Sequence, residues 1–155
     1  MTTVPLLSYV ARAAPRLDRA GVEAARLIRV ARDRLVTESP SVTYELLAQA
    51  RGTNENTARQ WVLRRRSAGT IITVDHDGTV LMPAFQFDDA YDDVIPEVAA
   101  VTSRLTEAGM SGWAIWSWFD TVNPWIERRP AELIGTGQHD TLADLADRLA
   151  DPEAD

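Results

Sequence analysis

The segment from residue 43 to residue 66, TYELLAQARGTNENTARQWVLRRR, constrains the fold of this chain more than any other. It predicts a short amphipathic helix over Tyr44–Arg51, a tight turn at Gly52 and a second helix over Glu55–Arg66. Ala48 is small enough for the two helices to cross closely. This order is the sequence form of a helix-turn-helix, whose second helix enters the DNA major groove. The alternative is an ordinary helical hairpin with a polar outer face.

Within the second predicted helix, Ala58, Trp61 and Val62 recur at helical spacing and are expected to face the core. In the first helix we expect Leu46 and Leu47 to point inward, with Ser41 or Thr43 as the cap. We expect Thr53 to cap the second helix.

The polar side chains of the second helix match the chemistry of DNA recognition. Asn56 and Gln60 can pair with adenine edges and Arg59 with guanine, while Thr53 and Thr57 can hold phosphates at the helix N-terminus. The three final arginines form a candidate phosphate clamp, or they complement the helix dipole. The candidate DNA-binding residues are Thr53, Asn54, Asn56, Thr57, Arg59, Gln60, Arg64, Arg65 and Arg66.

The net charge of -7 hides an uneven distribution along the chain. Residues 1–70 carry twelve Arg and six acidic residues, whereas residues 71–155 carry four Arg and seventeen acidic residues. Such a split suggests a nucleic-acid face beside a separate partner-binding face. All sixteen basic residues are Arg, which suits phosphate and guanine recognition but also follows from GC-rich codon usage.

Residues 16–36 predict a helix that Pro15 opens and the sequence TESP at residues 37–40 closes. Its apolar stripe consists of Leu17, Gly21, Ala24, Ile28, Ala31 and Leu35.

After the two central helices, strands at Thr70–Val74 and Thr79–Met82 are expected to form a hairpin around an Asp-Gly turn at Asp75–Gly78. This hairpin has the position of a small wing. Phe85 and Phe87 are available to pack on the helices, and we interpret the sequence DDAYDD (residues 88–93) as a solvated linker.

The remaining residues predict a helical lobe. Residues 95–109 are expected to form a helix with Val98, Val101 and Leu105 facing inward. A short helix is expected over Pro130–Ile134. A last helix is expected to carry Leu142, Leu145 and Leu149 on one side. We therefore predict a mainly α protein: a helix-turn-helix with a small β-hairpin wing, plus a C-terminal helical lobe. The predicted domains are an N-terminal helical segment (1–40), the helix-turn-helix with hairpin (41–90) and a helical toxin- or partner-binding domain (91–155).

The segment 116–138, WSWFDTVNPWIERRPAELIGTGQ, has an unusual order of an aromatic cluster, Asn-Pro, Arg-Pro and Glu-Leu-Ile before glycines. It resembles the C-terminal toxin-binding domain of the Xre/MbcA/ParS-type antitoxins. The preceding stretch, SAGTIITVDHDGTVLMPAFQF (residues 67–87), is similar to the strand pair and Pro-Ala-x-Gln-Phe segment that link the two parts of some members. The residues that carry the match are Trp118, Asn123, Pro124, Pro130, Glu132 and Leu133.

The resemblance implies a type II antitoxin that binds and neutralises a RES-domain toxin acting on NAD. It also implies that the chain represses its own operon by binding double-stranded operator DNA. The candidate partner-binding residues are Trp118, Asn123, Pro124, Trp125, Arg129, Pro130, Glu132 and Leu133. Trp113, Trp116 and Trp118 cannot all face one side of a helix, so we expect most tryptophans in the core and Trp118 and Trp125 at an interface.

The sequence predicts no enzyme. His76 and His139 lack ligand-spaced partners, so no metal site is expected, and no cofactor-binding motif is present. Ser117 and Asp120 have no histidine to complete a nucleophilic triad. We expect a cytoplasmic chain without a membrane span, and a homo-oligomer. The alternative function is a stand-alone transcriptional regulator whose C-terminal lobe dimerises or binds a ligand. Whether residues 1–40 dimerise is left open.

Overall fold

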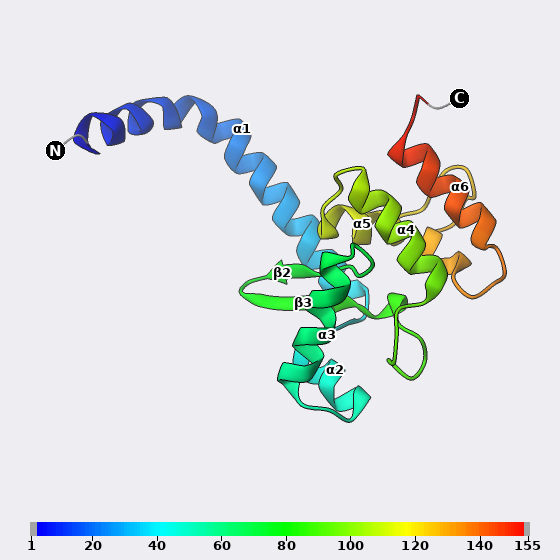
Figure 1. Ribbon diagram of the computed structural model, residues 1–155. Coiled ribbons are helices and arrows are strands. Elements are labelled where there is room, and N and C mark those ends of the chain that lie inside the picture. Colours follow the sequence, from blue (N-terminus) through cyan, green and yellow to red (C-terminus); the bar gives the residue numbers. More distant parts are fainter. Residues whose placement is uncertain (1–2, 154–155) are drawn as a thin grey trace. The chain divides into compact units, whose positions relative to one another are not determined.

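The structure is a computed structural model that describes the backbone of residues 3–153 and the side chains of residues 19–153. Within this range the chain is mainly helical and carries a small three-stranded antiparallel sheet (Figure 1). The elements are α1 (Thr3–Glu38), β1 (Ser41–Val42), α2 (Tyr44–Arg51), α3 (Glu55–Ser67), β2 (Val74–His76), β3 (Thr79–Pro83), the 3-10 helix η1 (Ala84–Gln86), α4 (Pro96–Glu107), α5 (Gly112–Phe119), the 3-10 helix η2 (Pro130–Leu133) and α6 (His139–Ala150).

The chain divides into two compact units, residues 1–37 and residues 38–155. The first unit is the helix α1, and the second contains every other element. The segments 41–90 and 91–155, which were expected as separate domains, both lie in this second unit.

Helix α1 begins at Thr3, so the prediction that Pro15 opens the helix is wrong. A proline has the backbone φ angle of a helix, and the residues around it, Ala13 and Ala14 before it and Arg16 and Leu17 after it, are good helix formers. The predicted end is confirmed, since the helix ends at Glu38. Leu17, the first residue of the predicted stripe, lies outside the side chains that the structure describes.

Helix α2 begins and ends as the sequence predicts. The Thr43 hydroxyl accepts a hydrogen bond from the Leu46 amide, and Gly52 takes the left-handed conformation (φ 67°) that ends the helix. Leu47 is fully buried, but Leu46 is 48% exposed, so its predicted inward position is wrong. Adjacent positions on a helix lie about 100° apart, and the core reaches only one of the two.

The sheet has the strand order β1-β3-β2, with β3 in the centre. Val74–His76 pair with Thr79–Leu81 around a two-residue turn in which Asp77 (φ 52°) and Gly78 (φ 83°) are left-handed. This is the backbone of a two-residue hairpin turn and confirms the Asp-Gly prediction. Strand β1 was not predicted, because two residues are too few to show alternation.

The predicted strand at Thr70–Val74 is wrong except for its last residue. Thr70–Thr73 form no ladder, and the Gln86 side chain instead takes the place of a neighbouring strand. Its carbonyl oxygen accepts a hydrogen bond from the Ile72 amide (2.8 Å), and its amide donates to the Ile72 carbonyl (2.9 Å). Gln86 and Ile72 are both buried, so this side chain satisfies backbone groups that water cannot reach.

Helix α5 approaches the same segment from the other side. A Cβ added at Gly112 would overlap the carbonyl oxygen of Thr73, so only glycine allows this contact. Trp116 is fully buried, and its indole N–H donates to the Ser39 hydroxyl at 3.1 Å. These contacts join the C-terminal helices to the start of the second unit.

The predicted helices of the C-terminal part are confirmed. Helices α4 and α6 pack side by side, with Val98, Val101 and Leu105 buried on α4 and Leu142 and Leu145 on α6. Leu149, expected on the same side, is 42% exposed.

The two phenylalanines after the sheet pack on helices, as predicted. Phe87 lies 6.3 Å from Trp61 of α3, and Phe85 lies 4.9 Å from Phe119 of α5, measured between ring centroids.

Replacement of Gln86 with leucine is expected to destabilise the protein by about 2–4 kcal/mol, because it leaves both backbone groups of Ile72 buried without a partner. The measurement is urea unfolding followed by circular dichroism. Gln49→Leu, at an exposed position of α2, is the matched control and is expected to change stability by less than about 0.5 kcal/mol. Equal stability of the two variants would contradict the role assigned to Gln86.

Candidate functional site

Helix α3 packs on one side and presents the other to solvent. Ala58 and Val62 are fully buried, as the sequence predicts, whereas Trp61, which was expected in the core with them, is only half-buried. The helix begins at Glu55, and Asn54 caps it through a hydrogen bond from the Thr57 amide to its side-chain oxygen (2.8 Å). The prediction of Thr53 as the cap is therefore wrong, since the helix starts one residue later than that position requires.

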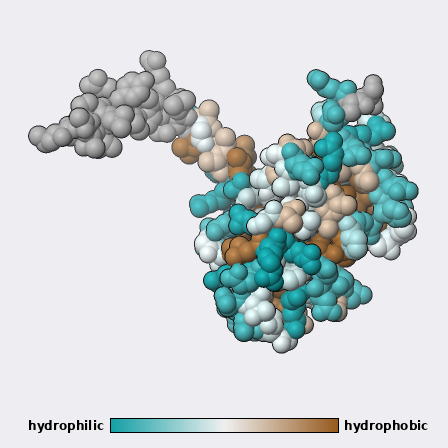
Figure 2. All heavy atoms as spheres, in the orientation of Figure 1, coloured by the Kyte–Doolittle hydropathy of each residue, from teal (hydrophilic) through white to brown (hydrophobic). Residues whose placement is uncertain are grey.

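The outer face of α3 carries the predicted polar side chains. Asn56, Gln60 and Ser67 are exposed and share the centre of this face with Leu63, which is 37% exposed. Arg59 and Arg66 lie on one flank, and Thr57 and Arg64 lie on the other; all four are exposed. In Figure 2 hydrophilic side chains cover the α2–α3 end of the second unit. Leu63 was not predicted as part of this face, although its spacing of three residues from Gln60 and seven from Asn56 indicates it.

Arg59 is partly held within its own helix. Its guanidinium lies 3.4 Å from the Glu55 carboxylate and 5.2 Å from the ring centroid of Tyr44. An exposed ion pair of this kind contributes a few tenths of a kcal/mol, so a stronger acceptor can replace Glu55.

Arg65 is directed towards the protein rather than to solvent. It lies 3.2 Å from the Asp93 carboxylate, and its guanidinium carbon lies 5.2 Å from the ring centroid of Trp61. Arg51 lies over the same ring at 4.3 Å and donates hydrogen bonds to the carbonyls of Tyr91 and Asp92. Of the three predicted clamp arginines, only Arg64 and Arg66 are fully on the exposed side.

The acidic segment 88–93 is largely exposed, as expected of a solvated segment, but it is not a free linker. The two arginines bind it to α2 and α3, and a bridge between Phe87 and Val94 closes its base. The polar composition of the segment concealed these contacts, because the partners lie 28 to 41 residues away in sequence.

A second candidate surface is a groove of about 610 Å³ in the C-terminal part. It contains four of the predicted partner-binding residues, and its apolar rim is unusually exposed: Trp125 is 71%, Val122 59% and Leu149 42% exposed. The lining residues are Met110, Ala114, Ser117, Trp118, Thr121, Val122, Asn123, Pro124, Trp125, Leu145, Arg148 and Leu149.

The Asn-Pro motif builds the loop that presents Trp125. The Asn123 side chain accepts a hydrogen bond from the Trp125 amide (2.9 Å), and the Asn123 amide donates to the Arg128 carbonyl (2.8 Å). Glu127 takes a left-handed conformation (φ 54°) to complete the turn. The guanidinium of Arg148 lies 4.7 Å from the Trp125 ring centroid, so the ring is fixed by its loop and by one cation.

The predicted partner-binding residues outside the groove contribute to contacts within the protein itself. Pro130 is buried and Leu133 fully buried, so neither side chain is available to a partner. The Glu132 carboxylate accepts a hydrogen bond from the Arg129 amide at the start of η2, and the Arg129 side chain lies 3.8 Å from Asp120. Trp118 is half-buried against Phe119, at 5.0 Å between centroids.

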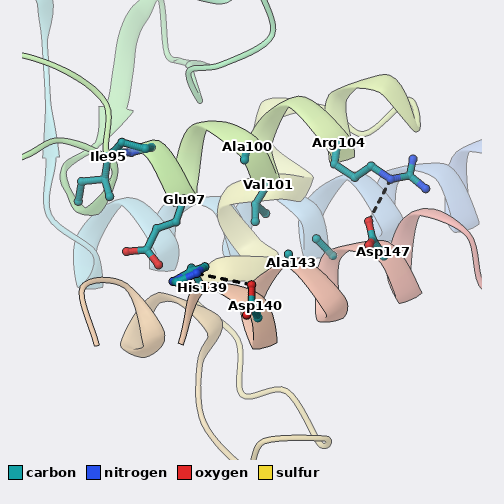
Figure 3. A pocket seen from close by; sticks show the side chains of 11 residues that line it. Ile95, Glu97, Ala100, Val101, Arg104, His139, Asp140, Ala143 and Asp147 are labelled. Carbon is teal, nitrogen blue, oxygen red and sulfur yellow. Dashed lines mark hydrogen bonds and ion pairs between the residues drawn. The ribbon is translucent and has the colours of Figure 1, made fainter. Parts of the chain in front are cut away.

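A further hollow of about 590 Å³ lies between α4 and α6 (Figure 3). Ala100, Val101 and Ala143 line its floor, and Arg104 bridges its rim to Asp147 at 3.2 Å. His139 lies 3.5 Å from Asp140, and the Glu97 carboxylate accepts a hydrogen bond from the Gly135 amide. The charged side chains around the hollow therefore have partners within the protein, and its chemistry indicates no particular ligand.

The residues that the structure describes provide neither a metal site nor a membrane-spanning helix. No group of three or more His, Asp or Glu side chains among them is arranged to hold a metal ion. Within the same residues, no helix combines the length and apolar character that crossing a membrane requires.

Comparison with known proteins gives a relationship of fold. The sequence matches no family model, and it matches no curated protein. The NMR structure of Rv2175c is similar, with a TM-score of 0.61 and 18% sequence identity over 73% of this chain and 82% of that chain. At this identity the likeness concerns the fold alone.

Replacement of Asp120 with asparagine is expected to stabilise the protein at neutral pH. Burial raises the pKa of Asp120 above its ordinary value of 3.8, an effect that outweighs the opposing attraction of Arg129, and Glu38 adds to the rise. A raised pKa in the folded state means that stability falls as the pH rises from 3.8 through the folded-state value. The asparagine removes this loss.

The measurement is urea unfolding of both proteins across acid and neutral pH. The advantage of Asp120→Asn is expected to shrink as the pH falls towards 3.8 and to stop changing below that value. Asp140→Asn, at an exposed carboxylate of α6, controls for the loss of one negative charge. An advantage that grows with acidity would contradict the assigned direction.

Proposed function

We propose that α2 and α3 form a helix-turn-helix that binds double-stranded DNA, with α3 in the major groove and the β2–β3 hairpin as a small wing. One observation carries this proposal: Asn56, Arg59 and Gln60 are all exposed, on a helix that Ala58 and Val62 fix from beneath. A helix whose outer face served only solubility would not need side chains that match base edges at successive turns.

The outer face of α3 combines two kinds of contact. Asn56 and Gln60 offer paired donors and acceptors for adenine, and Arg59 offers a fork for guanine. Leu63 adds an apolar contact of the kind that a thymine methyl group accepts. Arg64 and Arg66 flank these positions and suit phosphates, which position the protein but carry no sequence information.

We further propose that the groove around Trp125 binds a protein partner, and that the chain acts as an antitoxin. The partner is then a RES-domain toxin that acts on NAD, and DNA binding represses the shared operon. This proposal rests on the motif resemblance and on the exposed apolar rim of the groove, whose tryptophan is held in a fixed orientation. Exposed, preorganised aromatic rings are frequent anchors of protein interfaces.

In an Arg64→Ala variant, DNA affinity is expected to fall equally for all sequences, with a salt slope lower by about one unit, because one phosphate contact is lost. In an Arg59→Ala variant, affinity for the selected operator is expected to fall by about 1–3 kcal/mol, while affinity for unrelated DNA changes less. Both are measured by fluorescence anisotropy with labelled duplexes over a range of salt concentrations.

Arg128→Ala is the matched control, since it removes one exposed arginine from the C-terminal loop instead of α3. If Arg59→Ala and Arg64→Ala both bind like Arg128→Ala, α3 is not part of a DNA interface.

Co-expression with the adjacent reading frame is expected to yield a stable complex in which the toxicity of that product is suppressed. Trp125→Ala is expected to weaken the complex by about 2 kcal/mol or more, because it removes the most exposed apolar side chain of the groove. Isothermal titration calorimetry with the purified components measures this change.

Leu46→Ala serves as the control for Trp125→Ala, since Leu46 is an exposed apolar residue outside the groove. The stand-alone regulator is favoured instead if no complex forms while the full chain binds its operator.

A further inference from the structure

Helix α1 exposes a large apolar surface over the part whose side chains are described. Every residue from Arg19 to Arg34 is exposed, and Leu27 and Ile28 are 60% and 51% exposed. In Figure 2 hydrophobic side chains are visible on the coloured part of this helix. A single helix in water has little stability of its own and normally requires packing of its apolar face.

The apolar residues of α1 share one face at the spacing of a coiled coil. Residues 21, 24, 28, 31 and 35 alternate in steps of three and four, and Ala20 and Leu27 border the same face. The opposite face carries Arg26, Arg29 and Asp33. This face is therefore a seam suited to another helix of the same length.

From Ala24 to Leu35, small and large residues alternate along the seam; Leu35 is half-buried, and the other three residues of this stretch are exposed. Ile28 and Leu35 occupy one of the two heptad positions, and Ala24 and Ala31 occupy the other. In a parallel pair each residue meets its own copy, so bulky layers would alternate with alanine layers that leave voids. In an antiparallel pair the two heptad positions meet each other, so each large side chain lies opposite an alanine.

We propose that α1 pairs antiparallel with α1 of a second copy of this chain. In the register that this pairing selects, Ile28 packs on Ala31 of the second copy and Leu35 packs on Ala24 of the second copy. The proposal adds an interface to the functions described above and does not depend on either of them.

Charge complementarity supports the same arrangement. Arg34 borders the seam, and Glu23 lies outside it on the same side of the helix, at the heptad position of Val30, within reach of a long arginine side chain. The antiparallel register brings Glu23 within about two residues of Arg34 of the second copy, and symmetry repeats this pair at the other end. A parallel pair places Arg34 beside uncharged residues instead. Opposite charges at the flanks of a helix pair select its orientation.

Sedimentation velocity of the full chain tests the association, over about 1–500 µM protein, the range in which a short helical interface is measurable. We expect a dimer in this range and at least ~100-fold weaker association for Ile28→Asp, because the variant buries an unpaired charge in each half of the seam. Val30→Asp is the matched control, since Val30 is 50% exposed on the same helix but lies off the seam, and it is expected to associate like the unsubstituted chain.

Circular dichroism and urea unfolding of each variant establish that the second unit stays folded. The proposal is overturned if the unsubstituted chain is monomeric over the whole range, or if Ile28→Asp and Val30→Asp weaken association equally.

Cysteine cross-linking tests the orientation cleanly, because the chain contains no cysteine. In the antiparallel register the two Ala24 residues are separated by eleven residues, about 16 Å along the helix, too far for a disulfide. Ala24→Cys alone is therefore expected to give no covalent dimer, whereas the double variant Ala24→Cys/Leu35→Cys is expected to give one under oxidising conditions. A covalent dimer of the single variant would instead establish the parallel pair and overturn the proposed register.

Discussion

The hydrogen bonds between the Gln86 side chain and the backbone of Ile72 hold the second unit together at its centre. The segment they fix, residues 70–73, follows α3 directly, since the Thr70 amide bonds to the Arg65 carbonyl at the end of that helix. The same segment receives α5 through the contact of Gly112 with Thr73. The buried side-chain amide of Gln86 therefore helps to set how α3, the hairpin and the C-terminal helices are oriented relative to one another. Without it, the two backbone groups of Ile72 would stay buried and unpaired, at a total cost of about 2–4 kcal/mol.

Local signals were sufficient to predict most of the helices. Thr43 and Gly52 mark the ends of α2 by their own backbone chemistry, and the Asp77-Gly78 turn needs no distant partner. The errors occur where a tertiary contact decides. Residues 70–74 have the β-branched composition of a strand, yet a glutamine side chain completes their hydrogen bonding. Strand β1 exists only because β3 lies beside it.

In the candidate sites too, local sequence patterns predicted some positions, and tertiary contacts decided the others. The exposed and buried faces of α3 follow from helical periodicity, so Asn56 and Gln60 were placed correctly. The position of Arg65 was not predicted, because its partner Asp93 belongs to a segment 28 residues away in sequence. In the C-terminal motif, helical periodicity could not distinguish the residues that stabilise the loop from the residues that the loop exposes to solvent. Leu133 is buried and Asn123 organises the turn, whereas Trp125 is the side chain that the loop exposes.

The contrast between Trp116 and Trp125 has a practical consequence. Trp116 is sealed from solvent and bonded to Ser39, while Trp125 is mostly exposed beneath Arg148. Indole emission is blue-shifted in an apolar interior, and only solvent-accessible rings are quenched by dissolved iodide. In a variant whose other three tryptophans, Trp61, Trp113 and Trp118, are replaced by phenylalanine, the emission maximum follows the integrity of the interior, and quencher access follows occupation of the groove.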